Sequence, residues 1–191
     1  MMPLLKHDGE IDYLEHFMAP GEADQHFHLL LNSLDWQEEW LRIAGKSVQV
    51  PRLVSWYGDA GKTYRYAGVQ HEPQEWTPAL ASLRASLEAV CGRPFNSVLG
   101  NLYRTGQDAM GWHADDEPEL GHEPYIASLS LGAERTFEIR HNNTRKTQRM
   151  PLAHGSLLLM HGSFQTHWKH RIPRQPGCNL PRINLTFRYL V

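Results

Sequence analysis

The sequence predicts a mainly β fold with flanking helices, of the sandwich or jelly-roll type. Short runs rich in Val, Leu, Tyr, Phe and Thr alternate with Gly, Pro and Asn over most of the chain, which is typical of strands joined by turns. Two stretches carry apolar residues at helical spacing. The 191 residues fit one domain, because no repeat, low-complexity stretch or Ser/Gly linker divides them. We therefore expect sheets braced by two helices.

Two amphipathic helices are expected in the first half of the chain. The first lies within residues 20–40, where apolar residues recur at helical spacing. These residues are Phe27, Leu30, Leu31 and Leu34. The second has clearer boundaries, because Thr77 is a good N-cap, Pro78 suits the first helical position and Gly92 ends the pattern. Its apolar stripe consists of Leu80, Leu83, Leu87 and Val90.

The rest of the chain has the composition of short strands. Runs of β-branched, aromatic and aliphatic residues are separated by turn residues. The expected strands are Val48–Trp56, Ser97–Tyr103, Ile126–Leu131, Thr136–Arg140, Ser156–Met160 and Ile183–Tyr189. Many short strands with few helices favour a jelly roll.

The composition excludes several classes of protein. With 41% hydrophobic and 21% charged residues, the chain is neither disordered nor collagen-like. No apolar run approaches the roughly 18 residues that span a bilayer, and no apolar core of a signal peptide is visible. Two cysteines are too few for a disulfide framework or a Cys-based zinc site. We therefore expect a cytoplasmic, reduced protein without a membrane segment, and a monomer.

The net charge of −2 conceals an asymmetry along the chain. Residues 1–134 hold nine basic and 20 acidic residues, whereas residues 135–191 hold ten basic residues and one acid, Glu138. Such a basic segment can attract a polyanion such as nucleic acid, or its arginines can pair with the acidic first part of the chain. Composition leaves both interpretations open.

A metal site is suggested by histidines and a carboxylate. His113 and Asp115 are two residues apart, which puts both side chains on one face of a strand. A third ligand must come from a distant segment. The candidates there are His154, His161, His167 and His170. Two neutral imidazoles and one carboxylate form the facial triad that holds non-haem Fe(II) and leaves positions open, and arginines in the closing RINLTFR run suit a bidentate carboxylate.

Together these motifs resemble the AlkB family of Fe(II)/2-oxoglutarate-dependent dioxygenases, in particular its DNA-alkylation-repair branch. The matching segments include N-x-Y, H-x-D-D-E, HWKHRIP and PRINLTFR, and the resemblance covers about residues 48–191. These four motifs begin at Asn101, His113, His167 and Pro181. Three further segments also match the family, namely residues 50–68, 124–141 and 151–160. The resemblance implies a double-stranded β-helix, which is a jelly roll with helices on one side.

The resemblance also implies roles for nine residues. Those that match the three iron ligands are His113, Asp115 and His170. His170 precedes Arg182 by twelve residues, as in the family, and this match favours His170 over His167. Arg182 matches the arginine that binds the distal carboxylate of 2-oxoglutarate, and Arg188 matches the second arginine of that site. Further co-substrate contacts match Asn101, Tyr103, Asn184 and Thr186.

The implied reaction uses Fe(II), 2-oxoglutarate and O2 to oxidise a methyl group on a base nitrogen, with succinate, carbon dioxide and formaldehyde as products. Such a methyl group lies on the Watson–Crick edge, so the base must be flipped out or the substrate must be single-stranded. Tyr66 matches the aromatic residue that stacks on the lesion, His113 forms the other wall and Tyr64 shapes the pocket. Asp116 and Glu117 suit a cationic methylated base such as 1-methyladenine or 3-methylcytosine.

Plainer explanations exist for the substrate residues. Tyr64 and Tyr66 alternate on an expected strand and can be core residues, and Asp116 and Glu117 can be solvated loop acids. A basic surface within 135–149 can contact phosphates. Its residues are Arg135, Arg140, Arg145, Lys146 and Arg149.

The expected organisation is one domain over residues 1–191. Residues 1–47 form an N-terminal helical extension, 48–76 a nucleotide-recognition region and 95–191 the jelly-roll catalytic core. The segment 42–51 is short and lacks an obvious apolar tip, which predicts a preference for single-stranded DNA. The alternatives are the same chemistry on RNA, a protein or a small molecule, or a non-catalytic metal-binding jelly roll.

Overall fold

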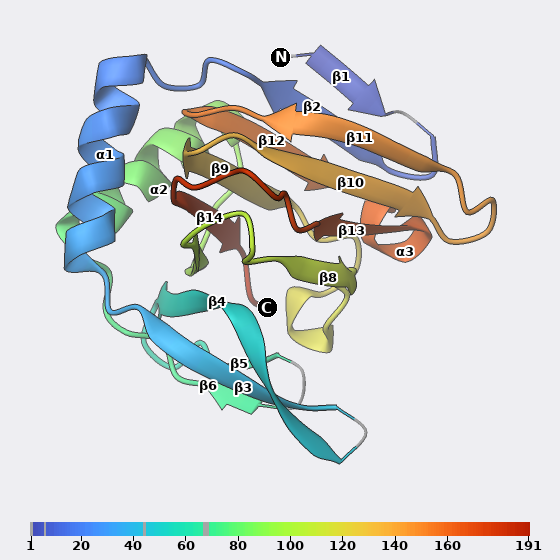
Figure 1. Ribbon diagram of the computed structural model, residues 1–191, viewed down its shortest axis with the longest axis horizontal. Coiled ribbons are helices and arrows are strands. Elements are labelled where there is room, and N and C mark those ends of the chain that lie inside the picture. The colour runs from blue at the N-terminus through green and yellow to red at the C-terminus, as the bar shows by residue number, and fades with distance from the viewer. Residues whose placement is uncertain (1, 6, 44, 67–68) are drawn as a thin grey trace.

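Two antiparallel sheets face each other in the computed structural model, which describes all residues except 1, 6, 44, 67 and 68 (Figure 1). The strands are β1 (Met2–Leu5), β2 (Glu10–Leu14), β3 (Gln37–Ile43), β4 (Lys46–Gly58), β5 (Tyr64–Tyr66), β6 (Val69–His71), β7 (Ser97–Tyr103), β8 (Met110–His113), β9 (Ile126–Gly132), β10 (Arg135–His141), β11 (Thr147–Leu152), β12 (Ser156–His161), β13 (Trp168–Ile172) and β14 (Arg182–Arg188). The helices are α1 (Pro20–Ser33), α2 (Pro78–Cys91), the single turn α3 (Phe164–His167) and the 3-10 turn η1 (Pro118–Leu120).

The strand order confirms the expected jelly roll. The larger sheet has the order β1-β2-β12-β9-β14-β7-β4-β3, and the smaller sheet has the order β11-β10-β13-β8. Strands β5 and β6 form a separate hairpin. All six strands expected from composition are present, with ends that differ by at most two residues at each boundary.

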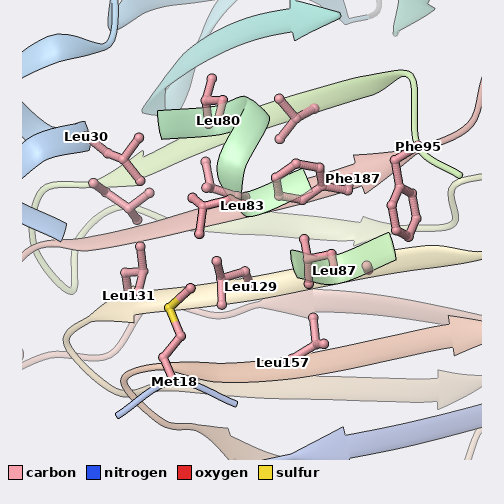
Figure 2. Close-up of a cluster of buried hydrophobic side chains, with 14 of the residues drawn as sticks. Met18, Leu30, Leu80, Leu83, Leu87, Phe95, Leu129, Leu131, Leu157 and Phe187 are labelled. Carbon is pink, nitrogen blue, oxygen red and sulfur yellow. The ribbon is translucent and has the colours of Figure 1, made fainter. Parts of the chain in front are cut away.

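Strand β14 shows how the alternation of side chains builds both the core and a polar interior. All seven of its residues are buried. Ile183, Leu185 and Phe187 point to the helices and join the main apolar cluster (Figure 2). Because successive side chains face opposite sides of a sheet, the four polar residues between and beside them point into the space between the two sheets. They are Arg182, Asn184, Thr186 and Arg188.

Helix α2 packs against the face of the larger sheet that points away from the smaller sheet, as its sequence predicts. The Thr77 hydroxyl accepts a hydrogen bond from the Leu80 amide at 3.2 Å, and Gly92 ends the helix in the left-handed region at φ 62°. Leu80, Leu83 and Leu87 are buried in the cluster shown in Figure 2. The prediction that Val90 is the fourth residue of the apolar stripe is wrong, because Val90 is 45% exposed near the end of the helix.

The helical character expected for residues 1–47 is correct only for α1, which ends at Ser33 and not near residue 40. Strands β1, β2 and β3 occupy much of the remaining segment, and β2 pairs with β12 in the larger sheet. Strands β1 and β3 pair with the next strand in the chain, whereas β2 joins the larger sheet through the distant β12, a pairing that local periodicity does not indicate. The division of the chain into an extension, a recognition region and a core stays a prediction.

In the described part of the chain, no helix has the length and apolar character needed to cross a bilayer. Both cysteines, Cys91 and Cys178, are free thiols.

Candidate active site

Two strands of the smaller sheet bring together the three residues expected to bind iron. His113 ends β8, and it pairs with His170 of β13, so that the two ring centroids lie 4.1 Å apart. Asp115 follows His113 by two residues and is buried. One potential ligand atom from each of the three side chains lies within 4.8 Å of the others. Strand pairing therefore assembles the predicted donor set from two distant segments.

The protonation of these residues suits a metal cation. The His113 Nδ1–H donates to the Gly111 carbonyl at 2.8 Å, which leaves Nε2 as the ligand atom, 3.9 Å from Asp115 Oδ1. Burial lowers the pKa of His113, and burial together with the neighbouring His113 lowers the pKa of His170 to about 3. Both imidazoles are therefore neutral at neutral pH.

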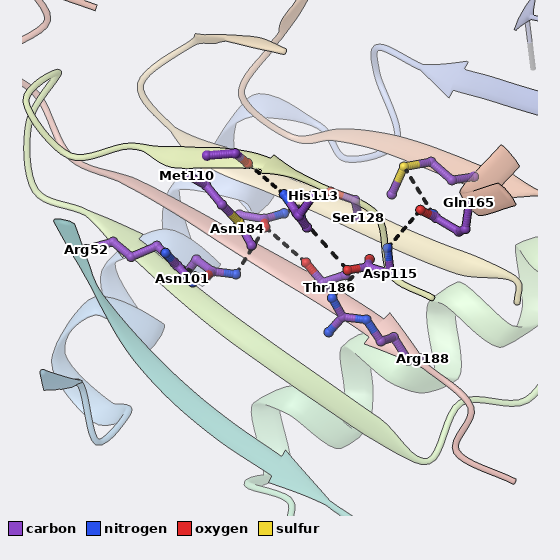
Figure 3. A network of polar contacts seen from close by, with 12 residues as sticks. Arg52, Asn101, Met110, His113, Asp115, Ser128, Gln165, Asn184, Thr186 and Arg188 are labelled. Carbon is purple, nitrogen blue, oxygen red and sulfur yellow. Dashed lines mark hydrogen bonds and ion pairs between the residues drawn. The ribbon is translucent and has the colours of Figure 1, made fainter. Parts of the chain in front are cut away.

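Asp115 keeps its negative charge although it is buried. Burial by itself would raise the pKa of this carboxyl, but the positive charge of Arg188, which also donates a hydrogen bond to it, lowers this pKa to about 2. Arg188 Nη2 lies 3.1 Å from Asp115 Oδ2, and the Asp115 amide donates to Gln165 Oε1 at 3.0 Å (Figure 3). Sequence reasoning missed Gln165, because no spacing links it to the H-x-D motif.

Arg182 supplies a buried cation at the other end of the same interior. Its side chain lies over the Tyr103 ring at 5.2 Å, and Nη2 donates to Ser130 Oγ at 2.9 Å. Burial lowers the pKa of Arg182 to about 10, so the guanidinium remains charged at neutral pH. Nε and Nη1 are buried without a hydrogen-bond partner among the described residues. A buried, incompletely paired guanidinium fits the carboxylate of a bound ligand.

One cavity between the sheets contains all nine residues predicted for iron and co-substrate. Its lining includes Asn101, Tyr103, His113, Asp115, His170, Arg182, Asn184, Thr186 and Arg188. The cavity therefore connects the donor set to the arginine that fits a carboxylate.

A family model described as the 2OG-Fe(II) oxygenase superfamily matches residues 10–188. The chain belongs to this superfamily. It is 42% identical over 181 residues to the bovine alpha-ketoglutarate-dependent dioxygenase alkB homolog 3, and 40% identical to its human counterpart. It is 41% identical over 182 residues to the human DNA oxidative demethylase ALKBH2. Within the superfamily, the chain is therefore an AlkB homologue.

These alignments cover 90% of this AlkB homologue, 63% of both homolog 3 proteins and 70% of human ALKBH2. The chain thus spans less than two thirds of the length of the first two relatives. Among solved structures, OsALKBH1 superposes with a TM-score of 0.61 at 19% identity, over 93% of this chain and 97% of that one, which supports the jelly-roll fold.

The cofactors of the superfamily are Fe(II) and 2-oxoglutarate, and the site of this AlkB homologue fits both. Two neutral imidazoles and one carboxylate are the donor set of the Fe(II) facial triad. Arg182 offers N–H groups to a carboxylate within the same cavity. The expected iron ligands and the expected co-substrate arginine therefore lie in one site.

A network of hydrogen-bonded polar side chains lies along the wall of this site (Figure 3). Arg52 Nε donates to Asn101 Oδ1 at 2.7 Å, and the Asn101 amide donates to Asn184 Oδ1 at 3.4 Å. The Thr186 hydroxyl donates to the same Asn184 oxygen at 3.0 Å. Arg52 is buried on β4, near Glu39 at 3.9 Å. Sequence reasoning assigned Arg52 no role, although a charged residue inside an apolar strand points to a buried partner.

The residues expected to bind the substrate base are placed only in part. Asp116 is exposed and Glu117 is partly buried, and both directly follow Asp115. Tyr64 and Tyr66 belong to the β5–β6 hairpin, but their side chains lie outside the described residues. The substrate roles of these four residues therefore stay predictions.

A groove of about 300 Å³ opens beside the iron site, between β4 and β8. Its walls are Val48, Gln49, Val50, Pro51 and Arg52 on one side and Ala109, Met110, Gly111, Trp112 and His113 on the other. Because His113 lines both the groove and the interior cavity, a group held in the groove lies next to this predicted iron ligand.

The prediction of a basic surface over residues 135–149 is wrong for Arg135. Arg135 is 1% exposed, and its guanidinium donates to the carbonyls of Thr105, Asp108 and Pro173. It therefore anchors loops within the fold. The carbonyl groups that bind Arg135 belong to segments distant from it in the chain, so composition did not indicate that this arginine is buried.

Asp8, His141 and His167 form a second cluster with potential ligand atoms close together. His141 Nδ1 accepts hydrogen bonds from the Asn143 and Thr144 amides, so its proton is on Nε2 and is donated to Asp8 Oδ2 at 3.0 Å. A metal at Nε2 would need that proton on Nδ1, where two N–H groups already point. This cluster is therefore better described as a structural tether than as a metal centre.

Proposed function

We propose that this protein is a nucleic-acid demethylase that oxidises N-methyl groups of alkylated bases of the 1-methyladenine and 3-methylcytosine type. The observation that carries the proposal is the common cavity of the predicted iron triad and Arg182, which shares His113 with a groove. Relatives that are about 40% identical include a DNA oxidative demethylase. We propose the same class of substrate here.

The cofactors, when bound, supply the oxidation of one C–H bond of the methyl group by O2, coupled to conversion of 2-oxoglutarate to succinate and carbon dioxide. The hydroxymethyl group that results leaves the base nitrogen as formaldehyde. Arg182 holds the distal carboxylate of 2-oxoglutarate through a charge-assisted hydrogen bond. Arg188 keeps the Asp115 carboxylate charged and oriented.

The substrate base enters the groove between β4 and β8. Its methyl group must reach the cavity side of His113, so the base is flipped out or comes from a single strand. Asp116 is exposed and follows Asp115 directly, and in this proposal its carboxylate favours a cationic methylated base over a neutral one. Glu117 has the same charge and neighbourhood, and Tyr66 supplies a ring for stacking.

We also propose a preference for single-stranded DNA. Strand β3 ends at Ile43 and β4 begins at Lys46, so their connection is short. A short connection offers little length for a wedge that holds a duplex open, and unstacking costs a few kcal/mol per step. Equal rates on matched single-stranded and double-stranded methylated oligonucleotides would contradict this preference. A monomeric state and a location in the cytoplasm are proposed with it.

The proposed function is tested by incubating the protein with Fe(II), ascorbate, 2-oxoglutarate and an oligonucleotide that contains 3-methylcytosine. Mass spectrometry should show loss of the methyl group, and the loss should require both 2-oxoglutarate and His170. The matched control is His170→Ala, which removes one iron ligand. Formation of succinate with an unchanged base would leave the oxygenase chemistry intact and refute the nucleic-acid substrate. An RNA oligonucleotide with the same base tests the choice of polymer.

A further inference from the structure

The outer face of the smaller sheet carries an aromatic ring in contact with two arginines. On β13 and β10, Arg171 follows the inward His170 and Arg140 follows the inward Ile139, so alternation places both arginine side chains on the outer face of the sheet, although Arg171 also borders the cavity. The guanidinium carbons of Arg140 and Arg171 lie 4.3 and 4.5 Å from the centre of the Trp112 ring. Both distances are within the range of favourable cation–π contacts.

A buried carboxylate holds one of these arginines in place. Glu138 accepts hydrogen bonds from Arg171 Nε and from Arg149 Nε, each at 2.6 Å, and its own side chain is 4% exposed. Hydrogen bonds from Arg171 and Arg149 offset the effect of burial and lower the pKa of Glu138. Because only Nε of Arg171 is engaged with Glu138, its terminal N–H groups remain available to a ligand.

Arg140 is even less engaged. Among the described residues it makes no hydrogen bond or ion pair, and its contact is the face of the Trp112 ring. Stacking on a ring leaves all the N–H groups at the edge of the guanidinium plane. Lys169 and Arg149 on the same face are exposed, whereas Glu138 is the single acid in residues 135–191. The face is therefore strongly positive, with its arginines held in defined positions.

This face lies close to the iron site. Trp112 precedes the ligand His113 on β8, and the same indole lines the groove between β4 and β8. Figure 1 shows β8 at the end of the smaller sheet that lies nearest to the β3–β4 hairpin. A chain whose one base occupies the groove must pass over or beside Trp112.

We propose that Arg140 and Arg171, positioned by Trp112 and Glu138, bind the phosphates that flank the base in the groove. We refer to these four residues as the Trp112 cluster. The inference rests on the proposed function and adds to it the residues that hold the nucleic-acid backbone. A guanidinium fork matches phosphate oxygens and carries no base preference, so the contact is expected to be independent of sequence. Trp112 and Glu138 are positioning residues in this proposal.

The experiment is fluorescence anisotropy of a labelled, unmethylated single-stranded DNA oligonucleotide, titrated between about 50 and 200 mM salt. Each lost phosphate contact lowers the slope of log K against log salt by about 0.7 for a single strand. We expect the double variant Arg140→Gln with Arg171→Gln to lose about 1.4 from this slope. Trp112→Leu should lower the slope as well, since it releases both arginines. Arg140→Lys keeps a charge and should retain most of the slope.

The matched control is Arg93→Gln. Arg93 is an exposed arginine whose guanidinium lies over another ring, that of Tyr125, after α2 and away from the smaller sheet. Thermal melts establish that the variants fold, since a folding defect does not alter the salt slope of the folded fraction. If the double variant and Arg93→Gln bind with the same slope as the unaltered chain, the cluster is not the phosphate site.

Demethylation of a 3-methylcytosine oligonucleotide is measured in parallel, which separates the two proposals. If the unaltered chain removes the methyl group and the double variant keeps the same salt slope, the Trp112 cluster is not the phosphate site. The proposed function is unaffected by that result. Binding that depends on Arg140 and Arg171, without any turnover, supports the cluster and refutes the proposed function. If the unaltered chain does not bind the DNA oligonucleotide at all, the proposal that the Trp112 cluster binds phosphates is refuted.

Discussion

The chemistry of single residues in the iron site depends on how Asp115 is held. Its carboxylate is buried, and the cation of Arg188 at 3.1 Å keeps it ionised. The Gln165 side chain fixes the adjacent backbone through the Asp115 amide. Partners of this kind orient metal ligands, and their loss commonly weakens metal binding tenfold to a hundredfold.

We therefore expect Arg188→Gln to weaken binding of Mn(II), used as a stable substitute for Fe(II), by about tenfold or more. The reason is that Asp115 would remain buried without its nearest cation, which raises its pKa and favours the protonated form. Isothermal titration with the metal alone, without 2-oxoglutarate, measures this effect. Arg93→Gln is the control, and an unchanged metal affinity in Arg188→Gln would show that the arginine serves the co-substrate only.

Glu138 predicts a dependence of stability on pH. Burial would raise the pKa of this carboxyl, but Arg171 and Arg149 lower it below its ordinary value of 4.5. A carboxyl with a depressed pKa in the folded state contributes stability above pH 4.5 that is lost as the pH falls through its folded pKa. Glu138→Gln should therefore lower the free energy of unfolding at neutral pH and flatten its decline in acid. Urea unfolding across this range measures both effects, and an equally steep decline in the variant would refute the assignment.

At the scale of elements, helix α2 and the N-terminal strands are stabilised in different ways. Helix α2 depends on an apolar stripe against the larger sheet. Among the described residues, the N-terminal segment instead has three carboxylate–imidazole pairs at 3.2 Å or less with histidines of the jelly roll. These pairs are Asp8–His141 at 3.0 Å, Asp12–His161 at 3.0 Å and Asp24–His154 at 3.2 Å. Histidines that composition left without a role therefore hold the acidic N-terminal segment in place.

For α2, we expect Leu83→Ala to cost about 2–5 kcal/mol of stability, because the side chain is 1% exposed and its loss leaves a cavity. The control on the same helix is Val90→Ala, which should change stability by less than about 0.5 kcal/mol, as for other exposed sites. Thermal or chemical unfolding of both variants measures the difference. Similar costs for the two would contradict the placement of the stripe.

For the N-terminal segment, we expect Gly9→Ala to be destabilising by more than about 1 kcal/mol. Gly9 has φ +119°, and an added Cβ would lie 2.3 Å from the Phe164 Cα of α3, where backbone cannot yield easily. Gly21→Ala in α1 is the control, since nothing lies within 4 Å of its added Cβ and alanine favours a helix. Opposite signs of the two changes in unfolding free energy are the expected result.

At the scale of the whole molecule, the two sheets enclose a cavity with polar walls beside a cluster of buried apolar side chains. Polar residues of β14 face this interior, and Arg182 lies there with hydrogen-bonding capacity to spare. Buried polar groups of this kind cost stability until a ligand satisfies them. Ligand binding should therefore stabilise the whole fold.

We expect 2-oxoglutarate with Mn(II) to raise the unfolding free energy, by about 2.7 kcal/mol at a ligand concentration one hundred times its Kd. Differential scanning fluorimetry measures this as a higher melting temperature. Arg182→Gln should keep the increment due to the metal and lose the further increment due to 2-oxoglutarate. If the variant retains both increments, Arg182 does not hold the co-substrate.

Local patterns in the sequence determined a large part of this protein. The caps of α2 and the alternation along β14 depend only on neighbouring residues, so they could be read directly. The spaced motifs, interpreted through the family resemblance, also predicted iron and co-substrate residues, and the structure brings these residues into one cavity.

The tertiary structure alone decided which polar residues are buried and with which partner. Gln165 reaches Asp115, Arg52 reaches Asn101, and Arg135 binds three carbonyls in two separate loops. It also decided that the N-terminal segment forms strands and that Arg140 and Arg171 meet at Trp112. The physical reason is that these contacts join segments far apart in the chain. Their free energy comes from pairing and burial in the folded molecule, which no local pattern encodes.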